Sequence, residues 1–491
     1  MLFNSPEFLL FLPIVFGLYW FVVQRNLKAQ NVLLLVASYV FYGWWDWRFL
    51  GLIAFSTVVD FFVGIRVAEA SEKRIKKRWM AVSLLVNLGL LAYFKYANFF
   101  IESWVDAWGA MGITMHASSL QVILPVGISF YTFQTLSYSI DIYRGTLKPT
   151  HSLINFAAFV SFFPQLVAGP IERASRLLPQ IENKREFTYE EGVAGLRLIL
   201  WGMFKKVVVA DTCAIYANDI FANYTEYAGP TLMLGAVYFA FQIYGDFSGY
   251  SDIAIGTAKL FGIQLMTNFK TPYFSRDIAE FWRRWHISLS TWFRDYLYIP
   301  LGGSRVGKWK AVRNVFIIFL VSGFWHGANW TFIVWGGIHA CLFLPLLLRG
   351  TNRRYTSETV GEGRWLPSDR ELLGMAWTFT MVCVAWVFFR MHTVADGIAY
   401  LKHALSSNWE VESLLEDFEK IRSGAGILKW IESFLLLVFP LLDFFESVYS
   451  SRYALIRSTS IVLILLSSTL ILVMLQFSLN GESNTFIYFQ F

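Results

Sequence analysis

Charged residues are scarce in this sequence. Asp, Glu, Lys and Arg make up 15% of its 491 residues, whereas soluble domains carry about 25%. It also has no internal repeat, no low-complexity tract and no Pro- or Ser-rich linker. These absences exclude a disordered chain, a fibrous repeat and a soluble enzyme with a few buried helices. What is present is 56% hydrophobic and 18% aromatic residues, which indicate an all-α polytopic membrane protein.

Cysteines are also few. Cys213, Cys341 and Cys383 lie far apart in apolar segments, without a C-x-x-C spacing. A thiolate metal site or redox pair is therefore unsupported, and we expect three small core residues and no metal. The net charge of +6 comes from basic residues beside apolar segments. Membrane topology places them there, so we expect membrane lipid as a partner and no nucleic acid.

Long stretches without Asp, Glu, Lys or Arg predict the membrane spans. The first runs from Phe8 to Val23. It is not expected to be a cleavable signal peptide, because it is preceded by the acidic Glu7 and lacks the basic residues that begin a signal peptide. A helix needs about 20 residues to cross the hydrocarbon. The further stretches are Ala29–Trp45, Trp79–Phe94, Ala107–Ile140, Ser152–Ile171, Tyr227–Gly245, Asn314–Leu348, Leu372–Phe389 and Ser458–Gly481.

The Lys and Arg residues predict the orientation. The segment Lys270–Arg313 holds nine basic and three acidic residues, so it is placed in the cytoplasm. Parity then puts His392–Lys429 outside. Two further groups mark inner loops: Lys73, Arg74, Lys76, Lys77 and Arg78 after the third span, and Arg349, Arg353, Arg354, Arg364 and Arg370. We expect about ten full crossings, two re-entrant pieces and both termini outside.

The two re-entrant pieces are stretches that do not fit a simple crossing. Pro164, Gly169 and Pro170 interrupt Ser152–Ile171. Asn314–Leu348 has basic flanks on both sides, and two full spans with a turn would need roughly 40 residues. We therefore expect a hairpin of two short or tilted helices over 314–348, with its tip near Trp325 to Asn329 deep in the membrane. Irregular backbone at that depth requires burial in protein or a wet cavity, and we expect a cavity.

Acidic residues in apolar segments are costly and often functional. Asp246 and Asp252 lie in the run YGDFSGYSD. They could hold a cation, a proton or an Arg from the inner segment, or they could form an ion-paired structural contact or mark the end of a span. Lys205 and Lys206 also lie in an apolar stretch, and we expect them to extend to the membrane interface.

The inner segment 270–313 carries the run FWRRWHISLSTWFRDYLYIPLGG. One interpretation is an amphipathic helix on the membrane surface, with an apolar face of Phe281, Trp285, Trp292, Phe293 and Tyr296. Its arginines Arg283, Arg284 and Arg294 would then face headgroups or a phosphate-bearing ligand. That interpretation leaves His286 unexplained. The run GGSRVGKW that follows lacks the hydroxyl of a phosphate loop and no strand precedes it, so an ATPase is rejected.

The strongest candidate site is SGFWHGANWTFIVWGGIHA, Ser322 to Ala340. His326 lies at the predicted tip of the hairpin, beside small residues that allow close approach and beside Trp325 and Asn329. Imidazole can accept a proton near neutral pH, as general base catalysis requires. A histidine that is merely hydrogen-bonded between helices is the alternative, and we assign that role to His339. Motifs for zinc proteolysis, serine hydrolysis and dinucleotide binding are absent.

Taken in order, these motifs resemble the membrane-bound O-acyltransferase family, in the branch that acts on alginate and teichoic acid. The resemblance runs from the opening MLFNSPEFLLFLPIV through the GPI-E-R run (Gly169 to Arg173), YGDFSGYSD, RRWHISLSTWFRDYLYIPLGG and FWHGANWTFIVWG to the ending FIYFQF. It therefore covers nearly the whole chain. The family's catalytic histidine falls on His326, and its second polar position falls on His286.

The resemblance implies a single membrane-embedded domain over 1–491, in which a ring of tilted helices surrounds a tunnel. It also implies an acyltransferase of the bacterial inner membrane, which has no bound cofactor and moves an acetyl group from cytoplasmic acetyl-CoA to an exopolysaccharide outside. A hydrolase-like extracytoplasmic partner would complete the transfer. D-alanyl transfer to teichoic acid and a non-enzymatic transporter are the alternatives, and acetylation of peptidoglycan or cellulose stays open.

Roles for the remaining site residues follow from this chemistry. His326 would act as the general base or, less favourably, carry the acyl group. Asn329 or the Trp325 indole would stabilise the oxyanion, and His286 would orient His326 or touch the donor. The guanidinium groups of the inner segment would hold the phosphates of the donor.

Overall fold

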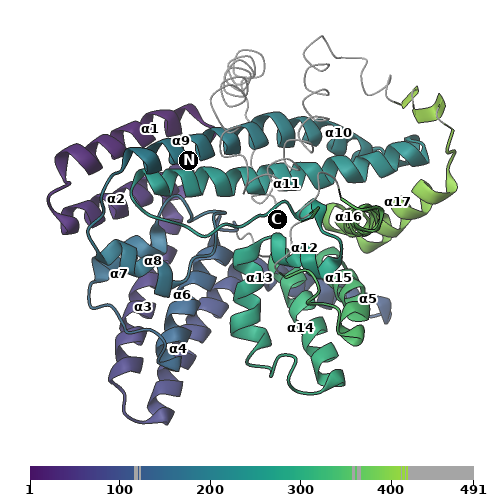
Figure 1. Cartoon of the computed structure of the whole chain (residues 1–491). Coiled ribbons are helices and arrows are strands. Elements are labelled where there is room, and N and C mark those ends of the chain that lie inside the picture. Colours follow the sequence, from purple (N-terminus) through teal and green to yellow (C-terminus); the bar gives the residue numbers. More distant parts are fainter. Residues whose placement is uncertain are drawn as a thin grey trace. The chain divides into compact units, whose positions relative to one another are not determined.

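The computed structural model describes residues 1–115, 120, 123–356, 360–361, 367–410, 412–414 and 416–417. Every regular element in that part of the chain is a helix (Figure 1). The chain divides into two compact units, residues 1–199 with 251–266, and residues 200–250 with 267 onward. Arg364, the predicted span Ser458–Gly481 and the ending FIYFQF lie outside the described residues.

The first unit contains eight complete helices and most of a ninth. α3 packs against α4 and α6, and α2 packs against α7. Asp60 of α3 is fully buried and accepts hydrogen bonds from Ser83 and Asn87 of α4 and Ser139 of α6, which ties these three helices together. The helices are α1 (Pro6–Gly17), α2 (Leu27–Asp46), α3 (Leu50–Glu69), α4 (Lys73–Leu91), α5 (Ala97–Ala110), α6 (Ile128–Arg144), α7 (Leu153–Ser161), α8 (Ala174–Glu182) and α9 (Tyr189–Phe204).

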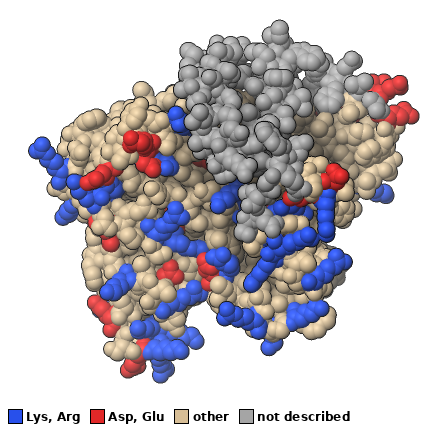
Figure 2. Space-filling model, viewed as in Figure 1, with Lys and Arg blue, Asp and Glu red and all other residues tan. Residues whose placement is uncertain are grey.

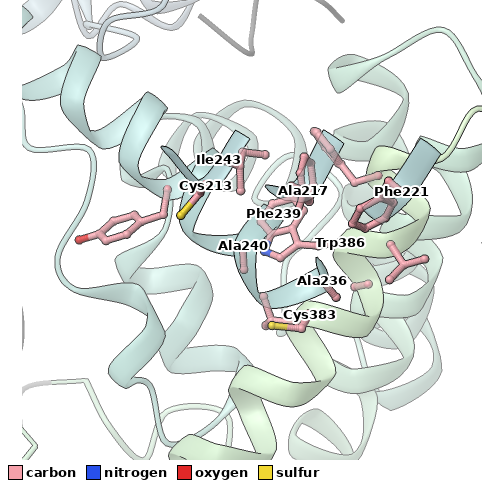
Figure 3. Close-up of a cluster of buried hydrophobic side chains, with 14 of the residues drawn as sticks. Cys213, Ala217, Phe221, Ala236, Phe239, Ala240, Ile243, Cys383 and Trp386 are labelled. Carbon is pink, nitrogen blue, oxygen red and sulfur yellow. The ribbon is translucent and has the colours of Figure 1, made fainter. Parts of the chain in front are cut away.

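The second unit is built around one large apolar core. Its helices are α10 (Asp211–Ala222), most of α11 (Gly229–Leu260, of which residues 251–260 belong to the first unit), α12 (Ile278–Arg284), α13 (Ile287–Phe293), α14 (Lys308–His326), α15 (Trp330–Arg349), α16 (Asp369–Arg390) and α17 (Val394–Ser406). Figure 3 shows part of the core, where Phe239 and Ala240 of α11 face Trp386 of α16. Cys213 and Cys383 are buried there, as predicted, but Cys341 is exposed, so the expectation of a third core cysteine was wrong.

Four segments of the described chain are long and apolar enough to cross a membrane. They are Leu27–Glu69, Lys73–Ala110, Trp330–Arg349 and Asp369–Arg390, and Pro6–Val22 is a shorter apolar helix. These segments agree with the predicted spans that fall on them. The protein is therefore an all-helical membrane protein, as the composition predicted.

The basic cluster after the third span does not form a loop. α4 begins at Lys73 and contains all five basic residues of the cluster, so only residues 70–72 connect it to α3. Lys and Arg are good helix formers, and at a helix end their charges stay exposed while the helix continues into the apolar run. Figure 2 shows basic side chains gathered at this end of α3 and α4 and, separately, over the surface near α13 and α14.

The stretch Ser152–Ile171 contains too little helix to cross a membrane. α7 has nine residues, which rise about 14 Å against a hydrocarbon thickness of about 30 Å. From Phe162 to Ile171 the backbone is irregular and every residue is buried. The interruption predicted at the proline and glycine residues is thus confirmed, and burial in protein is what irregular backbone in a membrane protein requires.

Candidate functional site

The hairpin that carries His326 consists of α14 and α15, which pack closely along their length. Gly323 and Gly336 make this approach possible, since a Cβ on Gly323 would stand 2.2 Å from Phe332 O and 3.5 Å from Gly336 Cα. α14 ends at His326 because Gly327 turns to extended backbone, where a Cβ would meet the ring of Phe332. α15 begins after Asn329, whose Oδ1 accepts a hydrogen bond from Thr331 N as an N-cap.

The tip of the hairpin falls at Gly327 to Asn329, within the region predicted from the sequence. Of the two alternatives, short helices are ruled out, because α14 has 19 residues and α15 has 20, and tilted helices stay a prediction. The helices extend past the uncharged stretch and include Lys308, Lys310 and Arg349 at their ends. Long basic side chains reach polar surroundings from a helix end, so a charge does not mark the end of a helix.

His326 is 5% exposed and is surrounded by aromatic rings. Its ring centroid is 5.0 Å from that of Trp325, 5.1 Å from Trp335 and 5.5 Å from Phe389. The Trp335 ring is fully buried, and its Nε1 has no hydrogen-bond partner among the described residues. A buried N–H without a partner costs about 1–3 kcal/mol, so this group requires an explanation, of which a catalytic role is one.

His286 lies beside His326, with 6.3 Å between the ring centroids. Its ring is fully buried, 4.6 Å from Phe247 and 6.1 Å from Trp325. Burial lowers the pKa of His286 to about 3, so the imidazole is neutral at ordinary pH. The two histidines selected from the sequence are therefore brought together in one apolar site.

The prediction of one amphipathic helix through this segment was wrong. The helix breaks between α12 and α13 because His286 adopts a left-handed backbone conformation, with φ of +42°, which is uncommon for a residue other than glycine. Phe281, Trp285 and Phe293 are buried, and the first two belong to the core of the unit. These aromatic residues therefore pack inside the protein instead of lying on a membrane surface.

Asn268 is a site residue that the sequence did not reveal. It is fully buried, and its Oδ1 lies 3.1 Å from His286 Nδ1. The same oxygen accepts hydrogen bonds from Ser288 N and Ser288 Oγ. Asn268 O accepts a further bond from Ile287 N. No motif surrounds Asn268 in the sequence, so its role could be found only once the chain had folded.

The three arginines proposed to hold the donor have separate partners. Arg283 donates to the carbonyl oxygens of Asn352 and Tyr355. Arg284 forms an ion pair with the buried Glu280. Arg294 pairs with its neighbour Asp295 and stays 59% exposed. A common phosphate site for these three residues stays a prediction.

Asp246 lies in the middle of α11 and is 2% exposed. It forms an ion pair of 2.8 Å with Lys206, which forms a second ion pair of 2.8 Å with Asp211. Lys206 is 1% exposed, so its predicted extension to the interface was wrong, and Asp246 forms the ion-paired structural contact that was one of the alternatives. Asp252 is partly buried and belongs to the other compact unit.

Two further polar residues have structural roles in the described chain. His339 is fully buried, and its Nδ1 accepts a hydrogen bond of 3.3 Å from Trp282 Nε1. This agrees with the structural role expected for His339. Asn329 caps α15 and donates from Nδ2 to His392 O, so both ends of its amide are already used. Its proposed role at an oxyanion stays a prediction.

Comparison with known proteins places this site in a family context. The model of the membrane-bound O-acyltransferase family matches residues 146–357, a range that includes both histidines. The chain is 44% identical to a Pseudomonas aeruginosa protein named "Probable alginate O-acetylase AlgI", over 92% of this chain and 84% of that protein. It is 36% identical to the peptidoglycan O-acetyltransferase of Helicobacter pylori, over 83% of this chain and 80% of that protein.

The chain is more distantly similar to a protein whose name specifies a different acyl group. It is 30% identical to the teichoic acid D-alanyltransferase of Bacillus subtilis, over 54% of this chain and 68% of that protein. The matches to the O-acetyl-transferring relatives are both longer and stronger.

Proposed function

This chain belongs to the membrane-bound O-acyltransferase family and is an acyltransferase, and we propose that it O-acetylates an extracytoplasmic polysaccharide such as alginate. The acetyl group comes from a cytoplasmic donor, acetyl-CoA, and crosses the bacterial inner membrane through the protein. The observation that carries the proposal is the pair His286 and His326, 6.3 Å apart and enclosed by aromatic rings. The similarity to alginate O-acetylases supports the acceptor.

A thioester is already activated, so the reaction needs a base and a hydrogen-bond donor for the oxyanion. His326 takes the proton from the attacking hydroxyl as its oxygen bonds to the acetyl carbonyl carbon. The tetrahedral intermediate then collapses, the C–S bond breaks, and the proton passes to the departing thiolate. A positioned base contributes about 10²–10⁴-fold to such a step.

The negative charge on the intermediate requires a hydrogen-bond donor. Trp325, proposed from the sequence, adjoins His326 with ring centroids 5.0 Å apart. Trp335 lies at a similar distance and has a buried Nε1–H with no partner in the described part of the chain. We favour Trp335 for this role, because a donor already committed to no other group can serve the oxyanion at no rearrangement cost.

The whole chain, 1–491, acts as one acyltransferase domain in this proposal. About ten crossings and two re-entrant pieces form a ring around a tunnel that leads to His326 from both sides. Residues 270–313 face the cytoplasm, where Arg283, Arg284 and Arg294 bind the donor's phosphates. Both termini lie outside, where a hydrolase-like partner completes the transfer to the polysaccharide.

Peptidoglycan is the second candidate acceptor. The similarity to a peptidoglycan O-acetyltransferase covers 83% of the chain and favours this acceptor over teichoic acid. The two acceptors require the same chemistry at His326 and differ only in what approaches from outside. Acetyl esters measured on each purified polymer, with and without the gene, distinguish them.

The test of the proposed function is His326→Ala in membrane vesicles supplied with labelled acetyl-CoA. Transfer of label to polysaccharide should fall by at least about 10²-fold, while the protein stays inserted at wild-type amounts. His151→Ala is the matched control, since His151 is exposed and belongs to the other compact unit. Retained transfer by His326→Ala would refute the catalytic role.

A further inference from the structure

Asn268 binds the segment around His286 through both its backbone and its side chain. Asn268 O accepts from Ile287 N at 2.9 Å, and Asn268 Oδ1 accepts from Ser288 N at 3.2 Å. These are the first two N–H groups of α13, which have no partner inside the helix. Asn268 thus caps α13 from a distant part of the chain and holds His286 in its left-handed conformation.

The backbone contact settles which end of the Asn268 amide faces His286. A backbone N–H can only donate, so the atom that meets Ser288 N must be the oxygen Oδ1 and not the nitrogen. That oxygen also lies 3.1 Å from His286 Nδ1, and it has no hydrogen to give. The hydrogen in this contact must therefore be on His286 Nδ1.

We infer that Asn268 is a positioning residue that fixes the tautomer of His286, with the hydrogen on Nδ1 and a lone pair on Nε2. The inference rests on the proposed function, since it concerns the histidine next to the catalytic base. A neutral imidazole with one protonated nitrogen must leave the other nitrogen as an acceptor. His286 therefore offers Nε2 as a hydrogen-bond acceptor inside the apolar site.

An acceptor at this place serves the reaction in a defined way. The rings of His286 and His326 are 6.3 Å apart, so His286 Nε2 can accept a hydrogen bond from an N–H group close to the base, either of the acyl donor or of His326 itself, while the substrate hydroxyl keeps its hydrogen for His326. The opposite tautomer would present an N–H at this place and could not accept that hydrogen bond. In metalloenzymes the partner that fixes the tautomer of a metal-bound histidine is worth about 10–100-fold in metal affinity or activity.

The first test reads the tautomer directly. Nitrogen NMR of the full chain in lipid nanodiscs, with ¹⁵N-labelled histidine and His286→Ala for assignment, should show that Nδ1 of His286 is protonated and Nε2 is not. Asn268→Ala should mix the two tautomers. A wild-type spectrum in Asn268→Ala would overturn the inference whatever the activity, so its failure is distinct from a failure of His326 as the base.

The second test reads the pH profile of acetyl transfer. Asn268→Asp keeps the acceptor oxygens, so the fold is retained, but its charge favours the imidazolium form and raises the pKa of His286. Below that pKa both nitrogens carry hydrogen and Nε2 no longer accepts. Asn268→Asp should therefore lose turnover at acid pH and regain it as the pH rises, with little change in KM.

Two variants separate this role from ordinary stabilisation. Asn314 is also fully buried and donates to the carbonyl oxygens of Leu301 and Gly303, so Asn314→Ala should lower thermal stability without moving the pH profile. Ser288→Ala removes the hydroxyl that also donates to Asn268 Oδ1 but leaves the contact between Asn268 and His286. This variant should keep the wild-type tautomer. A wild-type pH profile in Asn268→Asp would contradict the inference.

Discussion

The rings of His286 and His326 lie 6.3 Å apart although 40 positions separate them in the chain. Each histidine stands where a helix ends or begins, since His326 closes α14 and His286 precedes α13. Helix ends leave backbone groups and irregular turns that allow a side chain to be aimed. The site therefore forms where two helix ends meet inside an aromatic core.

The unpaired indole of Trp335 leads to the first prediction. Trp335→Phe keeps an aromatic ring against His326 but removes the N–H, so stabilisation of the oxyanion is lost. Acetyl transfer should fall by about 10²–10³-fold in turnover with little change in KM. Trp282→Phe is the control, because the Trp282 N–H is already used on His339. If the two variants have equal turnover, Trp335 is not the oxyanion donor.

The hairpin provides a second prediction from two adjacent glycines. A Cβ on Gly336 would stand 2.3 Å from Phe319 O, whereas a Cβ on Gly337 would meet nothing nearer than 3.8 Å. Gly336→Ala should therefore push α14 and α15 apart and cost about 1–3 kcal/mol of stability. Gly337→Ala should behave as wild type. Thermal unfolding in detergent checks both, and equal melting temperatures would contradict the tight crossing.

How much of this site the sequence predicts depends on how local the determining contact is. The tip at Gly327 to Asn329 was predicted because its glycine and N-cap residues are neighbours in the sequence. The break at His286 was not, because a left-handed conformation there depends on Asn268, eighteen positions earlier. One of the two partners of Lys206 was missed for the same reason, since Asp246 is contributed by a different helix.

That buried charge pairing leads to a third prediction. Lys206 holds both Asp211 and Asp246 at 2.8 Å, so Lys206→Met leaves two buried carboxylates without a cation. Loss of one partner from a buried ion pair costs about 3–5 kcal/mol. Lys259→Met, which breaks a partly exposed pair with Glu191, should cost less than about 1 kcal/mol.

The control for the Lys206 variant is a triple change. Adding Asp211→Asn and Asp246→Asn to Lys206→Met removes the uncompensated charges, and most of the lost stability should return. Thermal unfolding of the three proteins in the same detergent measures the effect. A triple variant no more stable than Lys206→Met would show that the lysine acts through its packing and not through its charge.

The neutral state of His286 predicts how the protein responds to acid. Burial lowers its pKa to about 3 in the folded protein, whereas an exposed histidine has a pKa of about 6.5. Because the unfolded chain binds this proton more readily, the stabilisation is present above about pH 6.5 and is lost progressively as the pH falls toward 3. Between pH 7 and pH 5 the loss from this one group amounts to about 2 kcal/mol. The glutamine in His286→Gln cannot be protonated, so this variant should lose about 2 kcal/mol less stability than the wild type between pH 7 and pH 5. Unfolding measured at both pH values tests this. An equal acid loss in the wild type and the variant would mean that His286 titrates normally in the folded protein.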